Sequence, residues 1–109
     1  MHRCEEVRCL LKDIGHNISE AREKIHKAYG MMEKSEAIAG WHKMMAARHL
    51  DFNEEAVAMV RKHLEEMRRE HKHEEEHMTL GKCEAYEEWL EQLLPQMAEV
   101  RAMIDRFAK

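Results

Sequence analysis

The stretch from Cys4 to Met32, CEEVRCLLKDIGHNISEAREKIHKAYGMM, decides the fold, because its apolar residues recur at alternating steps of three and four. That spacing places them in a line along one side of an α-helix, and such a line packs against neighbouring helices. We call it a seam. It predicts a helix over residues 3–29, which Gly30 can end in a left-handed conformation. The seam residues are Cys4, Val7, Leu11, Ile14, Ile18, Ala21, Ile25, Ala28 and Met32.

A second helix is expected over residues 36–49. Ser35 stands directly before Glu36 and fits the N-cap of this helix. Ile38, Met45 and Phe52 form its predicted buried stripe. Without a break near residue 30, residues 3–50 would instead form one rod about 70 Å long at 1.5 Å per residue.

A third helix is expected over residues 54–79. Asp51 is followed three residues later by Glu54, a spacing typical of a capped helix start. The apolar residues beyond it continue at the same alternating steps as in the first helix. They are Val57, Val60, Leu64 and Met67.

The last helix is expected over residues 82–108, after Gly81. Its apolar phase continues across Pro95, which predicts one kinked helix rather than two. Short connections between four helices favour an antiparallel up-down-up-down four-helix bundle, formed as a single domain by residues 1–109. The seam of the last helix consists of Cys83, Tyr86, Leu90, Leu93, Met97, Val100, Ile104 and Phe107.

Composition narrows the classes of function. The 109 residues carry a formal net charge of -4, and lysine and arginine are interspersed with acidic residues rather than gathered into a basic stripe, so nucleic acid is not an expected partner. No segment approaches the roughly 18 to 20 apolar residues of a membrane span, and the first residues lack the apolar stretch of a secretory signal. We therefore expect a soluble cytoplasmic protein whose three cysteines are free thiols.

A run of histidine and glutamate, HKHEEEH at residues 71–77, interrupts the apolar pattern of the third expected helix. Extending the seam beyond Met67 by the same steps lands on His71 and Glu74, at positions that are apolar on the preceding turns. Burying an imidazole and a carboxylate costs several kcal/mol unless they are hydrogen-bonded, paired or bound to metal. His71 and Glu74 are therefore the sharpest functional candidates in the sequence.

These residues predict a transition-metal site at one end of the bundle. In a four-helix arrangement the start of the second helix lies beside the end of the third, which brings His42 to the height of His71 and Glu74. His77 or Cys83 could be an edge ligand. Neutral imidazoles and a carboxylate suit Zn²⁺, Fe, Ni²⁺ or Cu²⁺. The expected function is metal storage, sensing or carriage.

Three alternatives stay open from the sequence. His71 and Glu74 could instead form a buried hydrogen-bond network that fixes the register of the helices. The chain could be a non-catalytic structural or adaptor bundle, acting as a homodimer or through another protein partner. A helical-bundle enzyme with Glu74 as general base is the third alternative.

Overall fold

Three helices make up the described part of the chain in the computed structural model, which describes residues 2–70 and 77–107. α1 spans His2–Met31, α2 spans Glu36–Glu70 and α3 spans His77–Arg106. No strand occurs in these ranges, so the all-helical class is confirmed. The prediction of a four-helix bundle is wrong, because residues expected in two separate helices, 36–49 and 54–79, run through a single α2 as far as Glu70.

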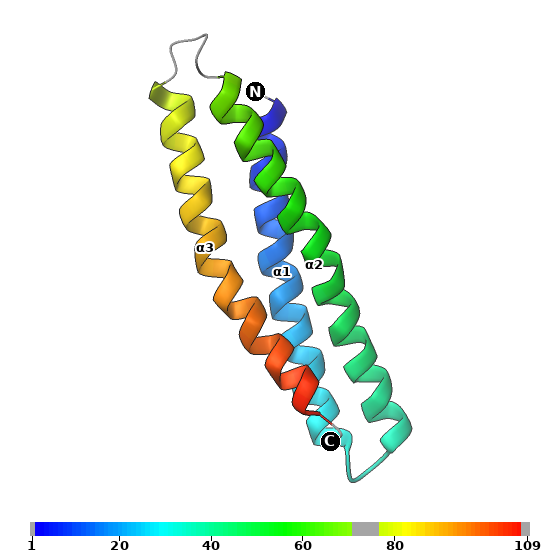
Figure 1. Cartoon of the computed structure of the whole chain (residues 1–109). Helices are drawn as coiled ribbons and strands as arrows, with labels where there is room; N and C mark the ends of the chain where they lie inside the picture. Colours follow the sequence, from blue (N-terminus) through cyan, green and yellow to red (C-terminus); the bar gives the residue numbers. More distant parts are fainter. Residues whose placement is uncertain (1, 71–76, 108–109) are drawn as a thin grey trace.

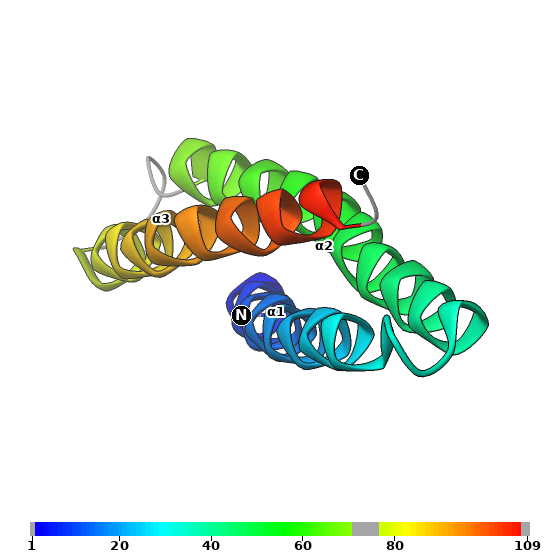
Figure 2. The same cartoon turned by 90° about the horizontal axis from the view of Figure 1, so that it is seen from below.

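The helices lie side by side along one long axis in up-down-up order (Figure 1). The N-terminus, the end of α2 and the start of α3 are together at one end, and the turn between α1 and α2 is at the other. Figure 2 shows α1 on one side with α2 and α3 on the other, so the helices form a bundle rather than a flat layer. The molecule measures 60 × 20 × 15 Å with a radius of gyration of 17.3 Å, well above the roughly 13 Å typical of a globular domain of this length.

The junction between α1 and α2 follows the expected N-cap. The Ser35 Oγ accepts a hydrogen bond from the backbone N–H of Ile38 at 3.3 Å, which satisfies one of the free donors at the start of α2. α1 continues through Gly30 to Met31, and Gly30 does not adopt the left-handed conformation expected for it. Residues 32–35 form the turn, so the alternative of one rod over residues 3–50 is excluded.

α2 stays helical through residues 49–54 because nothing there breaks it. The segment contains no proline or glycine, and the seam of the later residues extends backwards without a change of phase through Asn53 and Leu50 to Ala46. Asp51, expected as a cap, instead accepts a hydrogen bond from Arg101 of α3 at 3.0 Å. The same residues that suggested a helix start therefore form an ordinary helical turn whose acidic side chains face α3.

The core lies between the three seams. All α1 seam residues from Val7 to Ala28 are buried, and Val57, Val60, Leu64 and Met67 of α2 are buried opposite them. Burying one large aliphatic side chain contributes about 1.5–3 kcal/mol, so these seams dominate the stability of the bundle. α1 and α2 share the most extensive interface of the three pairs.

α3 is one helix across Pro95, as its apolar phase predicted. Gly81 also lies inside it, because the helix begins at His77 rather than after the glycine. Pro95 is exposed, on the side of α3 away from the core, where the lost backbone hydrogen bond is open to water. The seam residues Cys83, Leu90, Leu93 and Val100 are buried, which attaches α3 along its length to the other two helices.

A substitution at Phe52 tests whether α2 is continuous, because this residue lies inside a continuous α2 but would be the first residue of a helix that began after Asp51. Proline is tolerated as the first residue of a helix, as Phe52 would be if Asp51 were a cap, but inside a helix it costs about 3 kcal/mol or more. We expect Phe52→Pro to lose at least that much unfolding free energy relative to Phe52→Ala, which also lacks the ring. Urea unfolding followed by circular dichroism measures the difference, and equal stability of the two variants would contradict a continuous α2.

Candidate functional site

Two of the residues predicted to bind metal, His42 and His77, lie far apart. His42 lies in the second turn of α2, near the turn that joins α1 to α2, whereas His77 begins α3 at the opposite end of the bundle (Figure 1). His42 and Glu70 are 28 residues apart on one helix, about 42 Å at 1.5 Å per residue. His42 and His77 of one chain therefore cannot bind the same ion. The expected proximity depended on a chain reversal near residue 50 that does not occur.

His71 and Glu74 lie outside the described residues, so metal binding by the run at 71–77 stays a prediction. Among the side chains that the structure describes, no three histidine, cysteine, aspartate or glutamate residues are grouped closely enough to hold a metal ion. His42 is half-buried, with its Nδ1 buried and without a hydrogen-bond partner in the described part of the chain. Its ring packs edge-on against Trp41, with the ring centroids 5.1 Å apart.

A polar layer crosses the interface of α1 and α2 at mid-height. Asn53 is fully buried, and its Nδ2 donates to the backbone carbonyl of Ile14 at 3.1 Å. The Asn17 Nδ2 donates to the Asn53 Oδ1 at 3.2 Å. The Asn17 Oδ1 accepts from the His49 Nδ1 at 2.9 Å, which places the proton on Nδ1 of that imidazole. The hydrogen bonds thus run in one direction, from the half-buried His49 through Asn17 to the buried Asn53.

This layer was missed from the sequence because Asn53 was read as part of a helix start. The signal that could have found it is the seam itself, since Asn53 occupies the position between Leu50 and Val57 where the pattern calls for an apolar residue. Because the Asn53 amide is buried, only a register that supplies its hydrogen-bond partners is favourable. The layer therefore fixes the register of α1 against α2 in the way that a core asparagine does in coiled coils.

The outward face of α2 carries a second line of apolar residues, which the sequence pattern did not predict to be exposed. Ile38, Trp41, Phe52 and Met59 have exposed fractions of 46%, 50%, 56% and 49%, and Met45 is half-buried beside them. We call these five residues the outer stripe. The prediction that Ile38, Met45 and Phe52 form a buried stripe is wrong for Ile38 and Phe52, which are exposed.

The inversion follows from the phase of the helix. Once α2 is continuous, the seam ends in Asn53, Leu50, Ala46 and Ala39, and the outer stripe lies more than a quarter-turn away from it around the helix. The inward residues of the first half of α2 are small, while the large ones face out. Trp41 is consequently half-exposed.

A shallow hollow of about 320 Å³ lies on the outer stripe between α1 and α2. It is lined by Asn17 and His49 of the polar layer, together with Met45, Arg48 and Phe52. The lining combines apolar side chains with two polar residues and one cation. Such a hollow can receive an apolar or anionic side chain from another surface.

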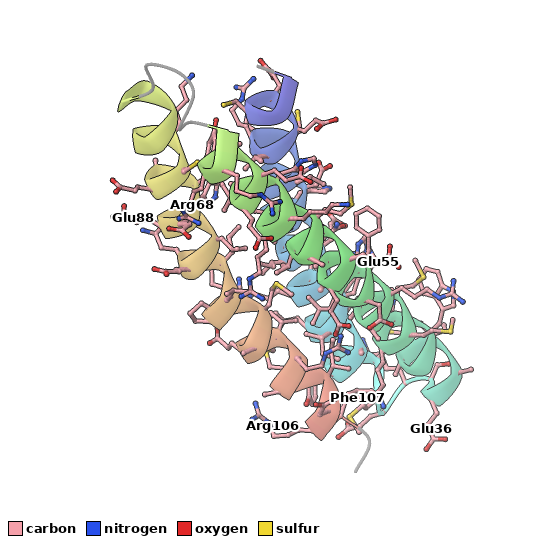
Figure 3. The ribbon with its side chains drawn as sticks, turned by 45° about the horizontal axis from the view of Figure 1, so that its top comes forward. Glu36, Glu55, Arg68, Glu88, Arg106 and Phe107 are labelled. Atoms are coloured by element: carbon pink, nitrogen blue, oxygen red, sulfur yellow. The ribbon has the colours of Figure 1, made fainter. Side chains whose placement is uncertain are left out.

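A second hollow of about 430 Å³ lies between α2 and α3 and is lined by leucines and charged residues. Arg68 reaches across it from α2 to the carboxylate of Glu87, and Figure 3 shows its side chain beside α3. This hydrogen bond raises the pKa of the Arg68 guanidinium. Arg68 and Glu87 pair across this hollow, so the ion pair joins the two helices. Its lining residues are Arg61, Leu64, Glu65, Arg68, Glu87, Leu90, Glu91 and Leu94.

Burial also sets the thiol chemistry. Cys4, Cys9 and Cys83 are free thiols, as expected. Burial raises the pKa of the Cys83 thiol and, nearby on α3, the pKa of the Tyr86 hydroxyl. A buried thiol with a raised pKa has little thiolate at neutral pH and is a poor nucleophile. Cys83 is therefore a core residue rather than a reactive one.

Comparison of the chain with protein-family models, with curated proteins and with solved structures finds no match in any of the three. The described helices contain no stretch that is both long enough and apolar enough to cross a membrane.

The polar layer yields a prediction for Asn53. Replacing it with alanine removes both hydrogen bonds of the Asn53 amide and opens a small cavity, changes that together cost about 1–3 kcal/mol. We expect Asn53→Ala to lose that amount of unfolding free energy. Asn17→Ala should not add to it in the double variant, because contacting residues couple by about 0.5–3 kcal/mol. A double-mutant cycle by urea unfolding measures the coupling, and strictly additive losses would contradict a shared layer.

Proposed function

We propose that the chain is a non-enzymatic interaction module that binds another protein surface through the outer stripe of α2. The observation that carries the proposal is the concentration of exposed large apolar residues on one face of one helix. Ile38, Trp41, Phe52 and Met59 follow one another along α2 and share that face. Scattered exposed apolar residues are ordinary, but a contiguous patch marks a contact surface.

The chemistry of the patch supports protein rather than lipid as the partner. Tryptophan, phenylalanine, methionine and arginine are enriched in the centres of protein interfaces, and the outer stripe with Arg48 is composed of these types and Ile38. A helix that lies on a membrane carries lysine and arginine along its polar face. Glu55 instead stands within the stripe, exposed on the side of α2 away from α3 (Figure 3), and the whole chain has a net charge of -4.

The proposal requires that the outer stripe be dispensable for folding, which neighbouring residues of α2 can test. Leu50 is 1% exposed and Phe52 is 56% exposed. We expect Leu50→Ala to lose about 2–5 kcal/mol of unfolding free energy, the usual cost of truncating a core leucine. Phe52→Ala should lose less than about 1 kcal/mol at low protein concentration, where association does not contribute. Similar losses for both would mean that Phe52 serves the core.

The binding itself is tested by photo-crosslinking in the producing cells. A benzoyl-phenylalanine at position 52 should form discrete covalent adducts on illumination, because the ring sits at the centre of the contact. The matched control is position 58, an exposed alanine on the same helix but about 120° around it from Phe52. Adducts of the same yield and mass from both positions, or none from position 52, would overturn the proposal.

A further inference from the structure

The part of the outer stripe from Met45 to Met59 is symmetric about Phe52. Met45 stands seven residues before it and Met59 seven residues after it, so the same side chain occurs at equal distances on both sides. Two charged residues lie between Met45 and Met59 on the same face of α2. Arg48 is four residues before Phe52, and Glu55 is three residues after it. A half-turn about an axis through Phe52 therefore exchanges methionine with methionine and brings the cation close to the anion.

We propose that the outer stripe binds the outer stripe of a second copy of this chain, with the two α2 helices antiparallel about a two-fold axis near Phe52. This rests on the proposed function and names its partner. The contact is self-complementary, as an interface with two-fold symmetry must be. Phe52 and the partner's Phe52 lie at its centre, and Met45 lies opposite the partner's Met59.

The charges select the antiparallel orientation. If the two helices ran parallel and in register, Arg48 would face the partner's Arg48 and Glu55 the partner's Glu55, and such like-charge contacts oppose association. In the antiparallel pair, Arg48 approaches the partner's Glu55 twice, once on each side of the axis. Neither Arg48 nor Glu55 has an ion-pair partner within the described part of its own chain. Both are exposed and available.

The hollow beside Phe52 adds a place for the partner's side chains. It opens on the outer stripe and is lined by Met45, Arg48 and Phe52 as well as by Asn17 and His49 of the polar layer. The stripe from Ile38 to Met59 extends over 21 residues, about 32 Å of helix. Two such antiparallel helices cover Phe52 together with Met45 and the partner's Met59 over about four turns.

Sedimentation equilibrium of the full chain over a wide concentration range tests the inference. The expected species is a dimer of 26.0 kDa, twice the 13.0 kDa of one chain. Phe52→Glu should be a monomer with unchanged helicity, since it places two carboxylates at the centre of the contact. The matched control Ala58→Glu, which adds the same charge to the same helix off the stripe, should remain dimeric.

Charge reversal tests the orientation. Arg48→Glu and Glu55→Arg should each raise the dissociation constant about tenfold or more, because each turns two attractive contacts into repulsive ones. The double variant Arg48→Glu/Glu55→Arg should restore the original dissociation constant to within about threefold. Recovery in the double variant also shows that the single variants fold.

The outcomes separate the two proposals. A monomer at all concentrations, a dimer that survives Phe52→Glu, or a double reversal without recovery would overturn the antiparallel self-association. If the chain is monomeric but position 52 still crosslinks to a species other than a second copy, the interaction module stands and its partner is a different protein. If the chain is monomeric and position 52 gives no adducts, both proposals fail.

Discussion

α2 keeps one helical phase from Glu36 to Glu70, and every residue on it therefore has a fixed direction relative to the seam of α1. Val57 and Leu64 must face inward, because α1 offers them its own seam to pack against. Carrying that phase back towards the start of α2 directs Ala46 and Ala39 inward and leaves Ile38 outside. The outer stripe is thus a geometric consequence of the core further along the same helix.

The polar layer makes that phase difficult to change. A purely apolar seam would tolerate sliding by a heptad, since one apolar residue replaces another at each step. Asn53 prevents this, because a shift would leave its amide buried without the carbonyl of Ile14 or the side chain of Asn17. Compared with apolar side chains of the same volume at these positions, the layer contributes little to the free energy of unfolding. It does raise the free energy of the alternative registers. It thereby fixes which residues of α2 face water.

The sequence predicts those features of the fold that depend on local patterns. The α1 seam, the N-cap at Ser35 and the unbroken helix across Pro95 all follow from spacing and side-chain chemistry. The break at Asp51 was wrong because an acidic residue before a glutamate occurs both at helix starts and on helix surfaces. Only Arg101, distant in sequence, reveals which applies. Three other predictions depended on that helix boundary. They were the fourth helix, the proximity of His42 to His71, and the burial of Ile38 and Phe52.

The distribution of side chains on the first half of α2 is not the one that best stabilises an isolated bundle. Large apolar residues contribute about 1.5–3 kcal/mol each when fully buried, yet Trp41 and Phe52 are half-exposed while Ala39 and Ala46 occupy the core. The inward positions of this half of α2 are occupied by the small side chains of Ala39 and Ala46, and the large ones point outward. The apolar surface that the fold leaves uncovered can be removed from water only by association. A second α2 with the same spacing of Met45, Phe52 and Met59 supplies a surface that matches it.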